Sequence, residues 1–242
     1  MLRFELNDPA YEFKKPQYMA CDFPISSKNK IKMPLLNRSH ATIIIGPPRS
    51  GKSSFVANLF KKDPKIYIQA FRNIIYACPP ASRSSAKDHP FNDIPEDHIF
   101  DSFDGFEIMD LVEKNRKKYG DNPYSQLLVI DDCSASLKKH EEVLSHLLLN
   151  RRHLNLTTFI LAQYLVHIPL SLRTNVDSIV AFKLSGKEME KLRNEFTQLN
   201  RQEMKQLIHF VWGNNKGRTH EYLVIHPDLD EYYKGMSKIE IK

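Results

Sequence analysis

Short runs of apolar residues alternate along this chain with segments in which apolar side chains recur at helical spacing. Runs rich in apolar or β-branched residues and closed by polar or turn-forming residues predict strands at Ala41–Ile45, Asn73–Cys78, Leu127–Ile130, Thr157–Ala162 and Ser178–Leu184. Helical spacing predicts helices at Lys52–Lys62, Phe106–Tyr119 and Glu141–Asn150. Because strands that alternate with helices are typical of βαβ units, the pattern predicts an α/β fold with a mostly parallel central sheet flanked by helices.

The pattern changes after Gly186. A helix is predicted at Lys187–Phe196, and two strands are predicted at Ile208–Trp212 and Glu221–His226. The segment Gly213–Gly217 between them contains glycine and asparagine, the residues that hairpin turns favour. We therefore expect a β-hairpin at the C-terminal end.

Three regions follow from these patterns. Residues 1–38 contain four prolines and no clear periodicity, and we interpret them as an extended arm that packs on the domain or on a neighbouring subunit. Residues 39–185 form the predicted core, in which the polar stretch Ala81–Asp101 is interpreted as a loop. Residues 186–242 are the C-terminal helix and hairpin, packed on the core.

Composition narrows the class of protein. The chain has 242 residues, 41% of them hydrophobic and 26% charged, which are ordinary values for a globular protein. The net charge of +6 favours an anionic partner such as nucleic acid, but only weakly. Three widely spaced cysteines, Cys21, Cys78 and Cys133, argue against a disulfide framework. No targeting segment or apolar run of membrane-spanning length is visible, so we expect a soluble, intracellular protein.

The segment Gly46–Ser53 has the sequence Gly-Pro-Pro-Arg-Ser-Gly-Lys-Ser and matches the phosphate-loop motif G-x-x-x-x-G-K-[ST] at each fixed position. Glycines let the backbone turn tightly and bring its N–H groups to the phosphates, and the helix that follows adds its positive N-terminal end. Lys52 is expected to contact the β- and γ-phosphates and Ser53 to bind Mg²⁺. A chance match occurs in roughly one chain in a hundred of this length. The residues expected to contact ATP are Gly46, Pro47, Pro48, Arg49, Ser50, Gly51, Lys52, Ser53 and Ser54.

Two carboxylates follow the apolar strand Leu127–Ile130. Asp131 is the candidate Mg²⁺ ligand, as a Walker-B aspartate is. Asp132 is the candidate general base that accepts a proton from the attacking water. A second acid at this place distinguishes hydrolysing ATPases from switch GTPases. The alternative is an ordinary acidic turn after a buried strand.

Gln163 follows the strand Thr157–Ala162. In additional-strand ATPases, a strand with a polar tip lies between the phosphate-loop strand and the acidic strand. Glutamine offers a donor and an acceptor, so it could orient the water or sense the γ-phosphate. The alternative is a glutamine with no role beyond its place at a strand end.

Taken together, four segments resemble the genome-packaging ATPases of large double-stranded-DNA viruses, the poxvirus-type branch of the FtsK–HerA superfamily. They are Ile43–Ser54, Leu127–Asp132, Asn150–Gln163 and Ile168–Asn175. The Arg-His-x-Asn segment before the Gln163 strand and the later Pro-x-x-x-Arg-x-Asn are more selective than the phosphate loop. The resemblance spans about residues 40–185 and covers neither the arm nor the C-terminal region.

The resemblance implies an additional-strand P-loop NTPase that uses ATP and Mg²⁺. It also implies a ring-shaped homo-oligomer that moves double-stranded DNA into a preformed capsid and docks on capsid or portal-vertex proteins. Such a protein would act in the host cytoplasm at viral assembly sites or with the virion. A basic residue from the adjacent subunit would complete each ATP site. Arg152 and Arg173 are the candidates, with Arg151 as a third, and the alternative for each is a solvated or salt-bridged arginine.

The DNA-contacting residues are less defined. A translocase is expected to grip phosphates with lysines and arginines on loops, and the candidate segments are Ser82–Lys87, Lys138–Lys139 and Lys216–Arg218. Short basic loops are more often plain solvated surface. Three other functions stay open: another DNA-pumping or helicase-type ATPase of the superfamily, a nucleotide kinase, and an ATP-regulated assembly scaffold. The adjacent acids and Gln163 favour hydrolysis over kinase chemistry.

Overall fold

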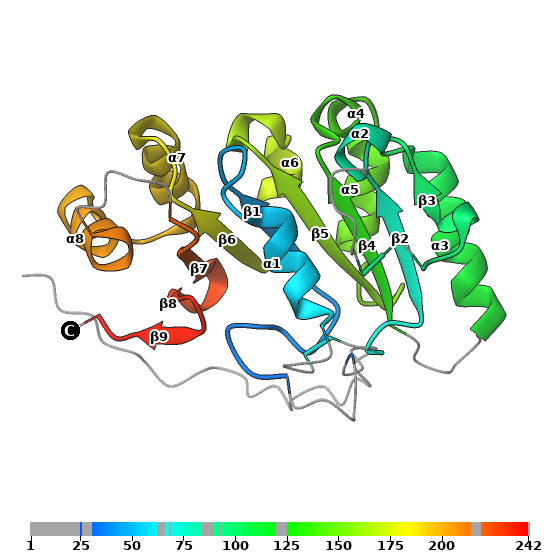
Figure 1. The fold of residues 1–242 in the computed structure, drawn as a ribbon, viewed down its shortest axis with the longest axis horizontal. Coiled ribbons are helices and arrows are strands. Elements are labelled where there is room, and N and C mark those ends of the chain that lie inside the picture. Colours follow the sequence, from blue (N-terminus) through cyan, green and yellow to red (C-terminus); the bar gives the residue numbers. More distant parts are fainter. Residues whose placement is uncertain are drawn as a thin grey trace, which may run out of the picture.

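The computed structural model describes residues 25, 31–61, 66–67, 69–83, 90–91, 93–119, 125–213 and 219–241. In these residues nine strands form one sheet in the order β3-β2-β4-β5-β1-β6-β7-β8-β9 (Figure 1). All neighbouring pairs from β3 to β6 are parallel. The strands are β1 (Ala41–Ile45), β2 (Asn73–Ala77), β3 (Ile99–Phe100), β4 (Gln126–Asp131), β5 (Leu156–Ala162), β6 (Ser178–Phe182), β7 (Tyr222–His226), β8 (Glu231–Lys234) and β9 (Ser237–Ile239).

Helices cover both faces of this sheet. Side chains alternate between the faces along a strand, so Ile43 and Ile45 pack on one face and Ile44 on the other. The first face is covered by α3 (Gly105–Tyr119), α4 (Ser134–Lys139), α5 (Glu141–Leu149), α6 (Leu170–Arg173), α7 (Gly186–Phe196) and α8 (Arg201–Trp212). The second face is covered by α1 (Lys52–Leu59), which crosses the sheet in front of β1 and β5 (Figure 1). Both faces are apolar, as expected for a parallel sheet between two helical layers.

The predicted strand at Ile208–Trp212 is wrong, because these residues form the last turns of α8. Met204, Leu207 and Val211 are buried at helical spacing, so tertiary packing overrides the β-forming tendency of the local sequence. A C-terminal hairpin exists, but β7 and β8 form it through the 3₁₀ turn η3 (Pro227–Leu229). Residues 214–218 lie outside the described residues.

Two further segments differ from expectation. The stretch interpreted as a loop contains α2 (Pro80–Arg83), the 3₁₀ turn η1 (Glu96–His98) and the short strand β3. Of the predicted arm, residues 1–24 and 26–30 lie outside the described residues. The described part contacts the core, since Leu36 O accepts from the Tyr67 hydroxyl and Ile25 O accepts from the Ser125 hydroxyl.

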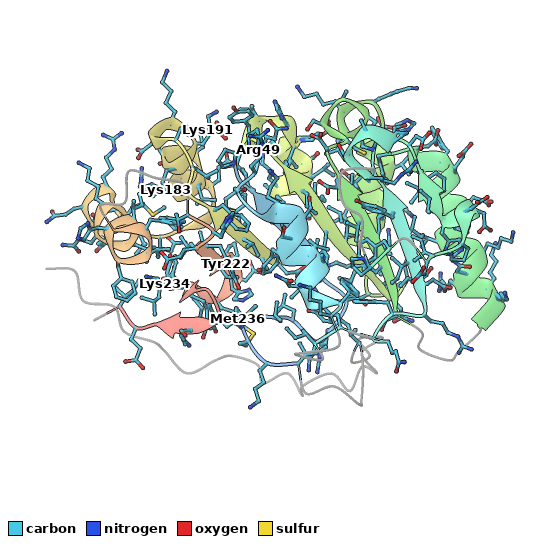
Figure 2. All side chains as sticks on the ribbon, viewed as in Figure 1. Arg49, Lys183, Lys191, Tyr222, Lys234 and Met236 are labelled. Atoms are coloured by element: carbon cyan, nitrogen blue, oxygen red, sulfur yellow. The ribbon has the colours of Figure 1, made fainter. Side chains whose placement is uncertain are left out.

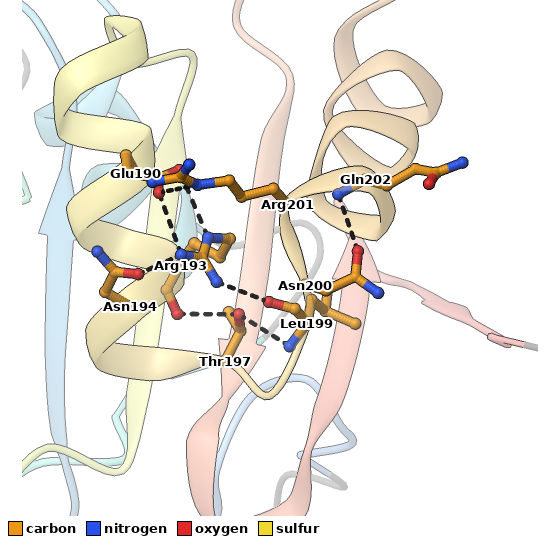
Figure 3. A network of polar contacts seen from close by, with 8 residues as sticks. All are labelled: Glu190, Arg193, Asn194, Thr197, Leu199, Asn200, Arg201 and Gln202. Carbon is orange, nitrogen blue, oxygen red and sulfur yellow. Dashed lines mark hydrogen bonds and ion pairs between the residues drawn. The ribbon is translucent and has the colours of Figure 1, made fainter.

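The N-terminus of α8 is capped by Asn200 (Figure 3). Its side-chain oxygen accepts from the backbone N–H groups of Gln202 at 2.8 Å and Glu203 at 3.0 Å. The Glu203 carboxylate in turn accepts from the Asn200 N–H at 2.7 Å, which completes a capping box. We expect Asn200→Ala to lower the free energy of unfolding by about 1 kcal/mol in urea denaturation. Gln202→Ala, on the same turn, is the control, and a loss no larger than the control's would contradict the capping role.

Candidate functional site

Three strands deliver the predicted site residues to the same edge of the sheet. β5 lies between β4 and β1, the order typical of additional-strand ATPases. Ile45 pairs with Ala162, and Asp131 pairs with Leu161. The phosphate loop after β1, the acids at the end of β4 and the residue after β5 therefore leave the sheet side by side.

The glycines of the phosphate loop are required by its geometry. Gly51 has a φ of 109°, a conformation that residues with a Cβ rarely adopt. A Cβ at Gly46 would lie 2.6 Å from Ser50 Oγ and 2.8 Å from Phe182 Cβ. Arg49 also has a positive φ of 61° and is exposed. The loop is thus a tight turn packed against the end of β6 and leading directly into α1.

Lys52 is folded back over the loop. Its Nζ donates to Gly46 O at 2.8 Å and to Pro47 O at 3.2 Å. Burial lowers the pKa of Lys52, while the negative charges of Asp131 and Asp132 act in the opposite direction. The ammonium group therefore lies between the loop and the acidic strand end, where it can neutralise a phosphate.

Ser53 and Asp131 form a pair that joins α1 to β4. The Ser53 hydroxyl donates to Asp131 Oδ2 at 2.8 Å. Burial raises the pKa of the Asp131 carboxyl, and the Ser53 hydrogen bond and the Lys52 charge oppose this rise. A hydroxyl and a buried carboxylate are oxygen ligands of the kind that Mg²⁺ prefers, usually with phosphates and water completing its shell. Within the described residues, no three His, Cys, Asp or Glu side chains cluster to hold a metal by themselves.

Asp132 faces Gln163 across the site. Gln163 Nε2 donates to Asp132 Oδ1 at 3.4 Å, and Ser82 Oγ donates to Asp132 Oδ2 at 3.4 Å. Both contacts are long for hydrogen bonds. Asp132 has a positive φ of 56°, which turns the chain sharply just after β4.

These side chains line a cavity of about 240 Å³, open to solvent beside the loop. Its polar wall consists of Lys52, Ser53, Ser82, Asp131, Asp132 and Gln163. The sequence prediction missed Ser82 as a residue of this site and placed it in a DNA-contacting loop. Ser82 follows β2 closely, and β2 pairs with β4, so Ser82 lies at the same edge of the sheet as the acids after β4. Its position after a predicted strand was the feature of the sequence that could have indicated this.

The three candidate arginines lie elsewhere. Arg151 pairs with Asp177 at 2.6 Å, and Arg173 pairs with Glu195 at 2.5 Å. Arg152 is exposed in the turn before β5, at the opposite end of that strand from Gln163. Of the described residues around the 240 Å³ cavity, none is one of these arginines.

Two of the candidate DNA-contacting segments are wholly or partly outside the described residues. These are Lys216–Arg218 and, within Ser82–Lys87, residues 84–87. The third, Lys138–Lys139, was interpreted as a loop and is instead the exposed last turn of α4. No helix in the described ranges is both long and apolar enough to cross a membrane.

Solved structures share this fold. The genome packaging NTPase B204 from Sulfolobus turreted icosahedral virus 2, in complex with ATP-gammaS, superposes with a TM-score of 0.56 and 12% identity, over 83% of this chain and 98% of B204. B204 from Sulfolobus turreted icosahedral virus, described as a DNA-packaging ATPase, gives 0.58 and 15%, over 84% and 98%. The cytoplasmic domain of the Thermomonospora curvata type VII secretion ATPase EccC gives 0.51 and 13%, over 96% and 28%. At such identities the likeness concerns the fold alone, and it confirms the predicted P-loop NTPase architecture.

Sequence comparison gives the family. An uncharacterized protein, 088R, from Invertebrate iridescent virus 3 is 26% identical over 151 residues, which are 61% of this chain. The match spans about half of that relative's length, 55%. Residues 28–231 match the model of the family described as Poxvirus A32 protein. This match covers well over half of the chain and confirms the resemblance inferred from the motifs, so the chain belongs to the poxvirus A32 protein family.

Proposed function

We propose that this protein is an ATP-hydrolysing motor that moves double-stranded viral DNA into a preformed capsid. The observation that carries the proposal is the convergence of Lys52, the Ser53–Asp131 pair, Asp132 and Gln163 on one cavity. The match to the poxvirus A32 protein family and the two viral B204 proteins, described as packaging enzymes, are the reasons for proposing DNA packaging as the use of ATP hydrolysis.

Each group has a role that its position allows. Lys52 binds the β- and γ-phosphates as they displace its amine from the carbonyls of Gly46 and Pro47. Ser53 Oγ and Asp131 would hold Mg²⁺, which would neutralise charge on the phosphates. Asp132 accepts the proton of the attacking water, and Gln163, 3.4 Å from Asp132, orients that water.

The three candidate arginines do not line the cavity of their own subunit, and in a ring of identical subunits one of them would reach the ATP site of the next subunit. In such a ring a guanidinium group from one subunit stabilises the transferred phosphoryl group in the next. Arg151 and Arg173 pair with Asp177 and Glu195 of their own subunit, and Arg152 lies exposed in the turn before β5. Arg152 and Arg173 stay the proposed residues for this role, with Arg151 as a third. Capsid or portal-vertex proteins are the proposed docking partners, at assembly sites in the host cytoplasm or on the virion.

The test is steady-state ATP hydrolysis by the wild-type protein with and without linear duplex DNA. We expect duplex DNA to raise the rate severalfold and the effect to decrease as salt increases, because phosphate contacts release counterions. Heparin at equal charge is the control for a general polyanion effect. If duplex DNA leaves the rate of ATP hydrolysis unchanged at all salt and protein concentrations, the proposed motor function is contradicted and an ATP-regulated scaffold is favoured.

A further inference from the structure

A second and larger cavity lies on the other side of the phosphate loop. It has a volume of about 560 Å³ and begins at Gly51 and Ser54, next to the residues that face the acidic cavity. From there it follows α1 toward Met236, in the turn between β8 and β9. Figure 2 shows Tyr222 and Met236 beside α1, on the side of the C-terminal strands. The loop therefore separates two spaces of different size and chemistry.

The wall of this cavity is aromatic. The Tyr222 ring lies 5.0 Å from the Phe55 ring and 5.7 Å from the Phe182 ring, measured between centroids. Phe55 and Phe182 are buried, whereas Tyr222 is half-buried and lines the cavity. Two fixed rings thus hold Tyr222 in place and leave part of it available for stacking.

This wall touches the phosphate loop directly. His220 Nδ1 lies 3.0 Å from Ser50 O. A Cβ placed on Gly51 would meet His220 Nδ1 at 3.2 Å and Phe182 Cε1 at 3.4 Å. A molecule whose phosphates lie in the loop would therefore have its other end at the aromatic wall.

We propose that the larger cavity binds the nucleoside half of the nucleotide, with the base stacked on Tyr222. The phosphates then pass over the loop into the acidic cavity of Asp131 and Asp132. A volume of about 560 Å³ lies within the range of about 300–1,000 Å³ typical of sites for small molecules. Flat bases stack well on aromatic rings, whereas phosphates require the charge and N–H groups of the loop.

Asn58 adds a polar edge to this cavity, one turn along α1 from Ser54. Its amide can both donate and accept, as the edge of a base or a ribose hydroxyl requires. Phe182 is the last residue of β6, Tyr222 is the first residue of β7, and His220 lies two residues before β7. His220 and Tyr222 belong to the C-terminal region, which the motif resemblance does not cover, so this region supplies part of the cavity wall.

This inference depends on one part of the proposed function, which is that phosphates bind at Gly46–Ser53. It does not depend on hydrolysis or on DNA. The test measures equilibrium binding by calorimetry with two probes, MgATP and magnesium tripolyphosphate, so that it does not depend on hydrolysis. We expect Tyr222→Ala to weaken MgATP binding about tenfold, because base–aromatic stacking contributes about 1–3 kcal/mol. Tripolyphosphate binding should change less than about twofold, since this probe has no base.

Two matched variants complete the experiment. Tyr222→Phe keeps the ring and should bind MgATP like the wild type. Phe210→Ala removes an aromatic ring that is 60% exposed on α8. This variant should also bind MgATP like the wild type. Unchanged MgATP binding by Tyr222→Ala would overturn the inference, as would an equal loss with tripolyphosphate, which would indicate damage to the loop. A wild-type protein that binds both probes but hydrolyses neither would contradict the motor and leave this inference standing.

Discussion

Lys52→Ala is expected to lower the rate of ATP hydrolysis at least about a hundredfold. The Lys52 ammonium lies against the carbonyls of Gly46 and Pro47 and between the loop and the acids of β4. Removing it leaves the phosphates without a positive charge at this point while the negative charges of Asp131 and Asp132 remain. Nucleotide affinity and turnover should therefore both decrease, as measured by calorimetry and by phosphate release.

The control for this variant is Lys205→Ala, which removes an exposed lysine on α8. Both variants should retain the wild-type circular dichroism spectrum, because neither lysine is part of the apolar core. A Lys52→Ala protein that hydrolyses ATP within about threefold of the wild-type rate would place phosphate binding elsewhere and reject the proposed site.

The second large effect concerns Asp132→Asn. Asparagine has nearly the same shape and keeps an oxygen that can accept from Ser82 or Gln163, but it cannot take a proton from water. We expect kcat to decrease about a hundredfold or more, because positioned general bases contribute about 10²–10⁴. MgATP affinity should stay within about threefold of wild type, since Lys52, Ser53 and Asp131 remain.

This separation of binding from turnover distinguishes the proposed functions. If the protein is a motor, Asp132→Asn should abolish DNA-stimulated hydrolysis and leave ATP binding intact. If it is a scaffold with negligible turnover, the substitution should change neither ATP binding nor assembly. Asp228→Asn, an exposed aspartate in η3, controls for the loss of one negative charge. Full activity in Asp132→Asn would assign the proton acceptor to another group.

Local sequence was sufficient where the determinants are contiguous. The buried strands β1, β4 and β5 are short apolar runs, so each was predicted within one residue of its bounds. The strand predicted at Ile208–Trp212 failed because its β-branched and aromatic residues outweighed a more distant signal. Asn200 and Glu203 form a capping box before the helical spacing of α8, and this signal was readable from the sequence.

Contacts between distant segments were beyond local reasoning. The Ser53–Asp131 hydrogen bond joins residues 78 positions apart, and the His220–Ser50 contact joins residues 170 positions apart. The first could be anticipated because both partners belong to recognised motifs. The second could not, because neither His220 nor Tyr222 belongs to a motif and only the fold brings them to the loop.

The strand order has a consequence for local stability. β1 has neighbours on both sides, and Ile43, Ile44 and Ile45 are fully buried. Its amide hydrogens can exchange with solvent only when much of the sheet opens, because slow exchange belongs to central, buried elements. In the described sheet β9 is an edge strand with one neighbour and exposed side chains, so its amides exchange through small local openings. The phosphate loop thus extends from a central strand whose amides exchange slowly, whereas Met236, at the far end of the larger cavity, lies beside an edge strand that opens locally.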